Sequence, residues 1–252
     1  MRLSARGIAV LLIAGVAGLG AFLWPLLVRP DADFVPGSQT PLILGALLLL
    51  LLVVVGVELT SDGLDVRALA VLGVLAAIGA ALRPLGTGTA GIELVFFLLI
   101  LGGRVLGPGL GYTLGAVTLF TSALLTGGVG PWLPHQMIAA GFVGLGAGLL
   151  PPAKGRWELG MLAAYGAVSA FAYGWLMDFA FWPFALGVHG ELSWNPEATT
   201  LENLHTFVLF NLATSMGWNL GRALTNVVLV AALGHGVLIL LRRAARRASF
   251  IA

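Results

Sequence analysis

The sequence contains no cysteine and few charged residues. Without cysteine, the 252-residue chain forms no disulfide and offers no thiolate for a metal or for nucleophilic catalysis. Only 10% of its residues are charged, against about 25% in soluble domains, whereas 59% are hydrophobic and the mean hydropathy is +1.00. This composition excludes a water-soluble globule and predicts an all-α polytopic membrane protein.

Sequence motifs of membrane enzymes and of ATP-binding proteins are missing as well. The chain has no D-D-x-x-D cluster, no H-E-x-x-H helix, no G-x-S-x-G elbow and no G-x-x-x-x-G-K-[ST] phosphate loop. The four histidines, His135, His189, His205 and His235, are too scattered for a metal site on one helix. We therefore predict no catalysis, no cofactor and no metal, and any ATP-driven transport would require another chain.

Uncharged apolar runs recur along the whole chain, and Gly- and Pro-rich breaks separate them. A helix of roughly 20 apolar residues crosses the ~30 Å hydrocarbon layer. Eight spans are predicted, at 7–28, 41–57, 66–82, 92–101, 110–126, 135–150, 158–184 and 218–241. The fourth is short because the run of glycines and Pro108 at 102–109 is expected to break it. Residues 203–217 are predicted to be a membrane-apposed part of the last outer loop.

The distribution of basic residues predicts the topology. With eight spans and a cytoplasmic amino terminus, 10 of the 13 Lys and Arg residues lie on the inside, as the positive-inside rule requires. A ninth crossing would place the four arginines of 242–247 outside. We therefore expect a multi-pass protein with both termini in the cytoplasm.

Polar and aromatic side chains gather at the opposite, outer ends of the predicted helices. An ionisable residue within a membrane span is by default a functional candidate. Arg222 is one such residue, and with the polar Asn219 and Asn226 it follows the spacing i, i+3, i+7, so the three share one face of the last helix. The full outer set is Arg83, Glu93, Trp132, His135, Gln136, Asp178, Trp182, Asn219, Arg222 and Asn226.

Structural interpretations of these residues remain open. Tryptophans at a membrane interface commonly form an aromatic belt. Arg83 and Glu93 are also explained by an ion pair that closes a loop. Asp178 is also explained by a position near the interface or by a hydrogen bond from a neighbouring helix, and Asn219 and Asn226 by hydrogen bonds between helices.

Five segments of the sequence resemble one family. They are Ala-Ala-Leu-Arg-Pro-Leu-Gly at 80–86, Gly-Gly-Arg-Val-Leu-Gly-Pro-Gly-Leu-Gly at 102–111, Gly-Pro-Trp-Leu-Pro-His-Gln-Met at 130–137, Gly-Leu-Gly-Ala-Gly at 144–148 and Gly-Arg-Ala-Leu-Thr-Asn at 221–226. In this order they resemble the substrate-binding S components of energy-coupling factor (ECF) transporters, over about residues 66–247. The resemblance implies a six-helix core with a basic cytoplasmic tail at 66–252, preceded by a two-helix addition at 1–65.

The resemblance also implies a function and partners. S components capture a water-soluble vitamin in an outward pocket of a bacterial cytoplasmic membrane, and a transmembrane T component and two ATPase subunits drive uptake. The outer set would then form the pocket, and the tryptophans suggest a bulky ring system such as cobalamin. By resemblance, small residues of the first core helix would face the T component: Ala76, Ala77, Ala80 and Ala81.

Two other functions stay open at the level of sequence. One is an integral-membrane enzyme or regulatory subunit acting on a lipid carrier, with Asp178, Glu93 and His135 as acid and base groups. The other is a secondary transporter, for which inverted repeats and broken helices are expected. No internal repeat is evident in the sequence.

Overall fold

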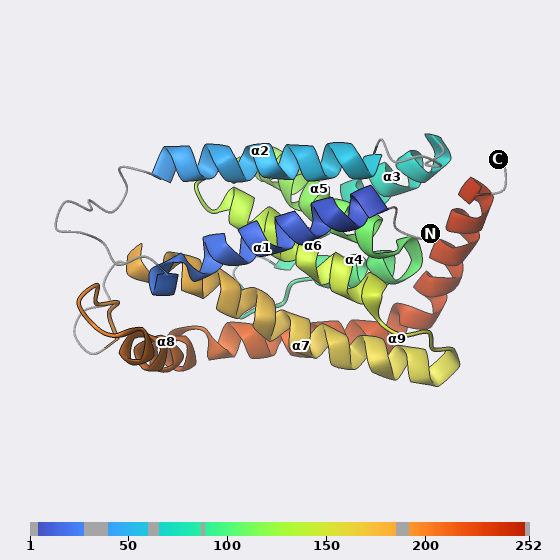
Figure 1. Ribbon diagram of the computed structural model, residues 1–252. Coiled ribbons are helices and arrows are strands. Elements are labelled where there is room, and N and C mark those ends of the chain that lie inside the picture. The colour runs from blue at the N-terminus through green and yellow to red at the C-terminus, as the bar shows by residue number, and fades with distance from the viewer. Residues whose placement is uncertain (1–4, 28–39, 60–65, 87–88, 185–191, 250–252) are drawn as a thin grey trace.

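The computed structural model is a bundle of α-helices (Figure 1). The structure describes residues 5–27, 40–59, 66–86, 89–184 and 192–249, and this part of the chain contains no strand. Its helices are α1 (Ala5–Leu27), α2 (Thr40–Leu59), α3 (Val66–Leu82), α4 (Val95–Leu106), α5 (Pro108–Thr126), α6 (Leu133–Leu149), α7 (Gly155–Phe181), α8 (Thr200–Thr214) and α9 (Met216–Ser249). Short 3₁₀ turns follow α3 at Arg83–Gly86 and α7 at Trp182–Phe184. The predicted all-α polytopic fold is confirmed.

The predicted spans correspond to α1–α7 and α9. Among the described residues, five helical segments are long and apolar enough to cross a membrane: Gly7–Leu26, Ala68–Gly86, Pro108–Thr126, Gly155–Phe184 and Met216–Arg247. α8 occupies most of the segment that was assigned to the last outer loop, and it lies across one end of the bundle, nearly end-on in Figure 1. The long apolar stretch at 203–241 is thus divided between a short helix and one long helix.

The expected break at 102–109 occurs later than predicted. α4 continues through Gly102, Gly103 and Arg104 to Leu106, and the chain turns at Gly107, whose φ is 89°. Helix packing explains the difference, because a Cβ atom on Gly103 would lie 2.1 Å from the carbonyl oxygen of Gly144 in α6. The glycines therefore allow the helices to approach one another closely in the core, as small residues do in membrane bundles.

The bundle has two ends of different character. α1 begins and α9 finishes at the same end, which we call the terminal end (Figure 1). At this end Glu158, near the start of α7, accepts hydrogen bonds from Arg104 of α4 at 2.8 Å and from Arg242 of α9 at 2.6 Å. The opposite end carries α8 and the Arg83–Gly86 turn, and we call it the pocket end.

α1 packs along α7 and α6. Hydrogen bonds at its last turn connect it to the pocket end. The indole N–H of Trp24 donates to the carbonyl oxygen of Ala180 at 3.1 Å, and that of Trp194 donates to Pro25 at 3.2 Å. The two indole rings lie 5.8 Å apart. α1 is thus joined both to α7 and to the segment that leads into α8.

Candidate binding site

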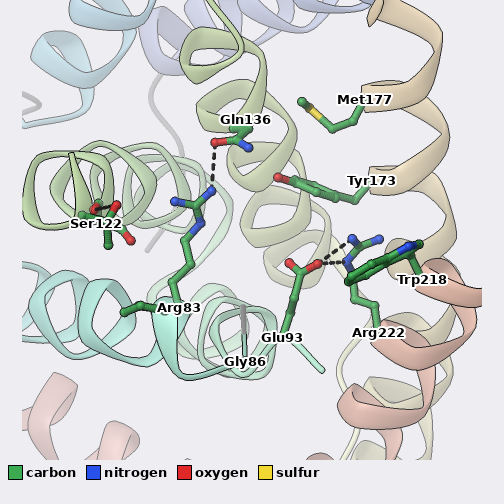
Figure 2. Close-up of a pocket in the computed structure, with 11 residues that line it drawn as sticks. Arg83, Gly86, Glu93, Ser122, Gln136, Tyr173, Met177, Trp218 and Arg222 are labelled. Carbon is green, nitrogen blue, oxygen red and sulfur yellow. Dashed lines mark hydrogen bonds and ion pairs between the residues drawn. The ribbon is translucent and has the colours of Figure 1, made fainter. Parts of the chain in front are cut away.

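A cavity of about 580 Å³ opens at the pocket end. Residues from the α3–α4 connection, α5, α6, α7 and α9 surround it, and Figure 2 shows their side chains converging. The lining consists of Arg83, Pro84, Gly86, Glu93, Ser122, Thr126, Gln136, Tyr173, Met177, Trp218 and Arg222. Its size lies within the range of about 300–1,000 Å³ that small-molecule sites occupy.

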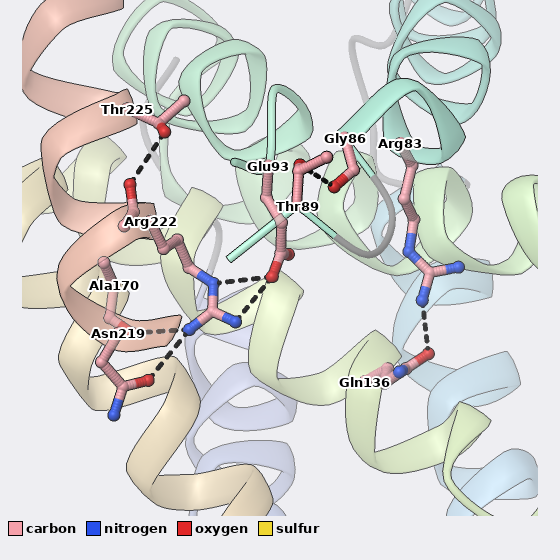
Figure 3. Close-up of polar contacts among 10 residues, drawn as sticks. Arg83, Gly86, Thr89, Glu93, Gln136, Ala170, Asn219, Arg222 and Thr225 are labelled. Carbon is pink, nitrogen blue, oxygen red and sulfur yellow. Dashed lines mark hydrogen bonds and ion pairs between the residues drawn. The ribbon is translucent and has the colours of Figure 1, made fainter. Parts of the chain in front are cut away.

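An ion pair between Glu93 and Arg222 forms one wall of the cavity. Arg222 donates to Glu93 Oε1 from Nη2 at 2.6 Å and from Nε at 3.1 Å. The arginine side chain is 8% exposed, whereas that of the glutamate is 26% exposed. Glu93 therefore faces its partner (Figure 3) and also lines the cavity.

A tight backbone contact brings this pair together. Gly91 has a φ of 87°, and a Cβ atom on it would lie 2.2 Å from the carbonyl oxygen of Trp218 and 3.0 Å from the amide nitrogen of Arg222. Only glycine permits both this conformation and this approach. The turn before α4 therefore packs directly on the backbone of α9, and Glu93 follows two residues later.

Arg222 is also held from its other sides. Its Nη1 donates to Asn219 Oδ1 at 3.1 Å and to the carbonyl oxygen of Ala170 at 3.3 Å. The guanidinium carbon lies 5.5 Å from the centre of the Phe96 ring and 5.1 Å from that of Tyr173, within the range of cation–π contact. These contacts explain how Arg222 is accommodated within an apolar helix, because its charge is paired, its N–H groups are hydrogen-bonded and aromatic rings cover it.

Arg83 forms a second polar wall. Its Nη2 donates to Gln136 Oε1 at 3.0 Å, joining the turn after α3 to α6 (Figure 3). The predicted alternative of an Arg83–Glu93 pair is therefore corrected, because the packing of Gly91 on α9 places Glu93 against Arg222. Ser122 and Thr126, one turn apart on α5, line the cavity beside these groups.

Four residues of the predicted outer set line the cavity: Arg83, Glu93, Gln136 and Arg222. Asn219 supports Arg222 from behind. Asn226, one turn deeper than Arg222 on α9, donates to the carbonyl oxygen of Gly166 at 3.0 Å and so joins α9 to α7. This hydrogen bond between helices agrees with the structural interpretation of Asn226 given above.

The other predicted residues lie outside the cavity lining. His135 is buried between the rings of Phe22 and Phe181, at centroid distances of 5.3 and 5.1 Å. Asp178 accepts a hydrogen bond from Asn211 of α8, as one structural interpretation expected.

Neither predicted tryptophan joins the cavity. Trp132 is exposed, and its indole N–H donates back to the carbonyl oxygen of Gly128. Trp182 is buried against Phe207 and Phe210 of α8, and its indole N–H donates to Leu192. These aromatic contacts hold α8 on the bundle and explain why Trp182 turns away from the cavity.

Sequence reasoning missed five lining residues that matter to the chemistry: Ser122, Thr126, Tyr173, Met177 and Trp218. Trp218 carried a signal, since it begins the last predicted span on the outer side, one turn before Arg222. The other four are ordinary residues of apolar helices. Only the rotation of α5 and α7 about their axes turns them toward the cavity.

The predicted alanine stripe of α3 divides between two faces. Ala76 and Ala80 are buried, and the neighbouring Gly79 lies against Thr118 of α5 and Leu98 of α4. Ala77 and Ala81 are exposed on the outer face of the helix. The first two alanines pack inside the chain in this structure, so a partner reaches only the second two.

The cavity offers hydrogen-bond donors and one carboxylate but no cluster of metal ligands. Within the described ranges, no three His, Asp or Glu side chains are placed together to hold a metal ion. Arginine, amide, hydroxyl and indole groups on walls that also present apolar and aromatic surface are suited to the binding of a small polar molecule.

Comparison with known proteins identifies a family. The model of a family described as "ECF transporter, substrate-specific component" matches residues 67–242. No curated protein sequence and no solved structure gives a match. The matched region runs from the start of α3 to the basic end of α9, so it contains all the described residues that line the cavity.

Proposed function

Since that family model covers more than half of the chain, the protein belongs to the substrate-specific components of ECF transporters, and we propose that it captures a water-soluble vitamin in the cavity at its pocket end. The family match carries this proposal, because it identifies the chain as the substrate-specific part of a transporter. The cavity supplies the location. Its described lining residues lie within the matched region and combine charged groups with aromatic surface.

Capture requires that the ligand leave water for a site built partly from apolar groups. Trp218 and Tyr173 offer ring faces for an apolar or aromatic portion, and Met177 adds an adaptable apolar contact. Arg83, Gln136 and the Glu93–Arg222 pair would replace the hydrogen bonds that the ligand loses on leaving water. The volume of about 580 Å³ suits a molecule of drug-like size, and we propose a vitamin smaller than cobalamin.

We propose that the pocket end faces the outside of a bacterial cytoplasmic membrane. Exposed basic residues gather at the terminal end, where α7 begins and α9 finishes, and the positive-inside rule assigns this end to the cytoplasm. They include Lys154, Arg156, Arg243, Arg246 and Arg247. Both termini would then be cytoplasmic.

We further propose that a transmembrane T component docks on the exposed face of α3 and that two ATPase subunits act through it. Ala77 and Ala81 are one turn apart on that face, so another helix could approach α3 closely there. The chain has no phosphate-binding loop of its own, so the energy for uptake would come from these partners.

Affinity purification of the tagged chain from native membranes tests both the capture of a vitamin and the association with a T component and ATPase subunits. We expect a T component and ATPase subunits to co-purify with the chain. Denaturation of the sample should release one small molecule in stoichiometric amount, which mass spectrometry would identify. The double variant Ala77→Leu/Ala81→Leu should lose the partners and keep the ligand. Ala164→Leu, at an exposed position of α7, serves as the matched control. Recovery of neither partner nor ligand from the unmodified chain would contradict the proposal.

A further inference from the structure

A second cavity, of about 370 Å³, lies between α1 and α6. Its described lining consists of six residues of α1 from Ile8 to Leu19, three of α6 from Phe142 to Leu149, and Pro108 at the start of α5. None of these side chains is polar, and none of them lines the cavity at the pocket end. We call this space the α1–α6 groove, and we infer that it holds an acyl chain of an anionic phospholipid whose head group lies at the terminal end.

The groove is wedge-shaped and opens toward the terminal end. α1 and α6 cross in Figure 1, and they touch at Gly18, where a Cβ atom would lie 2.8 Å from Ile138 Cγ2 and 3.1 Å from Phe142 Cζ. About one turn nearer the terminal end, a Cβ atom on Gly15 would meet no neighbouring atom of the described residues within 4 Å. Space is therefore present between the two helices on the terminal side of their contact.

The depth of the groove matches one leaflet of a bilayer. At ~1.5 Å per residue, the helix from Ile8 to Leu19 covers about 16 Å, roughly half of the ~30 Å hydrocarbon layer. A transmembrane helix of another protein would need a surface that continues through both leaflets. This groove ends where Gly18 meets α6, so its length suits a lipid tail better than a partner helix.

The apolar lining also selects against water. An ordered water needs two to four polar partners, and the described side chains of the groove supply none. An empty groove would forfeit dispersion contacts, whereas a lipid tail is as apolar as the leucines that it would meet. Leu12 and Val16 are 63% and 74% exposed, so the groove is open sideways to the bilayer. An acyl chain can therefore enter it directly from the surrounding lipid.

Basic residues follow the open end of the groove in the chain. α6 ends at Leu149, which lines the groove, and five residues later Lys154 precedes α7. Lys154 and Arg156 are exposed, and neither forms an ion pair with any of the described residues. Trp157 is 86% exposed, as a tryptophan at a membrane interface commonly is. Because basic residues near a membrane surface attract anionic head groups, the lipid is expected to carry a negative charge.

Native mass spectrometry of the full-length chain tests this inference. The chain would be purified in detergent, stripped of lipid and incubated with equimolar phosphatidylglycerol and phosphatidylcholine. We expect each chain to retain one phosphatidylglycerol. Gly15→Leu places a side chain in the groove and should lower the retained amount roughly 10-fold. Gly20→Leu is the matched control, because Gly20 is also an α1 glycine without a neighbouring atom within 4 Å but does not line the groove.

Thermal unfolding separates loss of the lipid from damage to the fold. Phosphatidylglycerol should raise the unfolding midpoint of the unmodified chain and of Gly20→Leu, and it should leave that of Gly15→Leu unchanged. Without lipid, Gly15→Leu should unfold no earlier than Gly20→Leu, because both variants replace glycine by a better helix former. Leu145→Phe narrows the groove from α6 and should act in the same direction as Gly15→Leu. If both groove variants retain and respond to the lipid as the unmodified chain does, the inference is wrong.

Charge variants locate the head group. Lys154→Gln/Arg156→Gln should lower the preference for phosphatidylglycerol over phosphatidylcholine roughly 5- to 25-fold. Arg243→Gln/Arg247→Gln removes the same charge from exposed positions near the end of α9 and is the control. Equal retention of the two lipids by the unmodified chain, or equal effects of the two double variants, would overturn the placement of an anionic head group at the start of α7.

These outcomes are independent of the proposed function. Gly15→Leu purified from native membranes should keep the T component, the ATPase subunits and the released small molecule. Loss of the T component from Gly15→Leu, with both partner and ligand retained by Gly20→Leu, would assign the groove to a partner helix and overturn the inference while the proposed function stands.

Discussion

Each end of the bundle contains a pairing of a glutamate with arginine that is at least partly buried, and the two pairings differ in what surrounds them. At the terminal end Glu158 is 2% exposed and lies between Arg104 and Arg242, whose side chains are 10% and 43% exposed. Arg104 also donates to the carbonyl oxygen of Leu150 at 2.8 Å. At the pocket end Glu93 is 26% exposed and borders the cavity.

The difference in exposure indicates that the same kind of ion pair has a different role at each end. The Glu158 cluster ties α4, α7 and α9 together, and its carboxylate is enclosed by protein. The Glu93–Arg222 pair also joins helices, but one side of it remains open to a ligand. Burial without a cavity indicates a structural role, whereas burial beside a cavity is compatible with binding.

The largest expected effect comes from breaking the enclosed cluster. Glu158→Gln removes the charge shared by two arginines and leaves Arg104 buried without a counter-charge, so we expect a loss of about 3 kcal/mol in the free energy of unfolding. Thermal denaturation of the purified protein would measure it. Ligand affinity per folded molecule should be unchanged. A changed affinity would contradict the purely structural role given to the Glu158 cluster.

A smaller loss of stability is expected from the open pair. Arg222→Met leaves Glu93 next to the cavity, where water can solvate it, so we expect roughly 1–3 kcal/mol. Unlike Glu158→Gln, this variant should also weaken ligand binding, because the cavity wall is altered. A double-mutant cycle with Glu93→Gln would give the coupling energy. A coupling near zero would show that the pair contributes nothing to stability.

The attachment of α1 to the pocket end should be weaker still. Trp24→Phe removes the hydrogen bond to Ala180, at a cost of about 1 kcal/mol. We expect faster hydrogen exchange of the amides of α8, since Trp24 also contacts Trp194 in the segment before that helix. Trp157→Phe is the matched control at the terminal end, because Trp157 is 86% exposed. Equal effects of the two variants would contradict the role given to α1.

The smallest effect concerns the start of α8 and depends on pH. The backbone N–H and the hydroxyl of Thr199 donate to Glu202, and these bonds lower the pKa of that carboxyl below its usual value. A lowered pKa means that this support is complete above the usual pKa of about 4.3 and is lost as the pH falls through the lowered pKa. Protection factors in the first turn of α8 should therefore fall in acid.

Thr199→Ala should destabilise the helix start by about 1 kcal/mol and weaken that pH dependence without abolishing it, because the variant loses both hydroxyl bonds of the capping box but keeps the backbone N–H that donates to Glu202. Thr200→Ala, at the exposed neighbouring position, is the control. Glu202→Gln removes the titrating group, so a pH profile that persists in this variant would assign the dependence to another group.

Much of the bundle could be predicted from the sequence, because hydropathy, charge and helix-breaking residues act locally. Apolar length identified the eight main helices, and the arginines at 242–247 favoured a single long final helix, which α9 confirms. The end of α4 was predicted too early for a tertiary reason. Gly103 fits against Gly144 of another helix, and that contact is invisible in the local sequence.

The candidate site was predictable only in part. The cost of placing charge in a membrane identified Arg222, Glu93 and Arg83 as candidates from their types and depths. The same argument drew in His135 and Asp178, whose contacts with Phe22 and Asn211 take them outside the cavity lining. Depth along a helix can be read from the sequence, but the direction of a side chain around the helix depends on packing.

The sequence by itself determined that this chain is a helical membrane protein with polar groups gathered at one end and basic groups at the other. It could do so because every backbone group in lipid must be hydrogen-bonded within its own helix, so length and composition are sufficient. Only the tertiary structure decided that Glu93 pairs with Arg222, that Arg83 contacts Gln136 and that a cavity lies between them. Those choices depend on close contacts between segments far apart in the chain, such as Gly91 on α9, which no local pattern records.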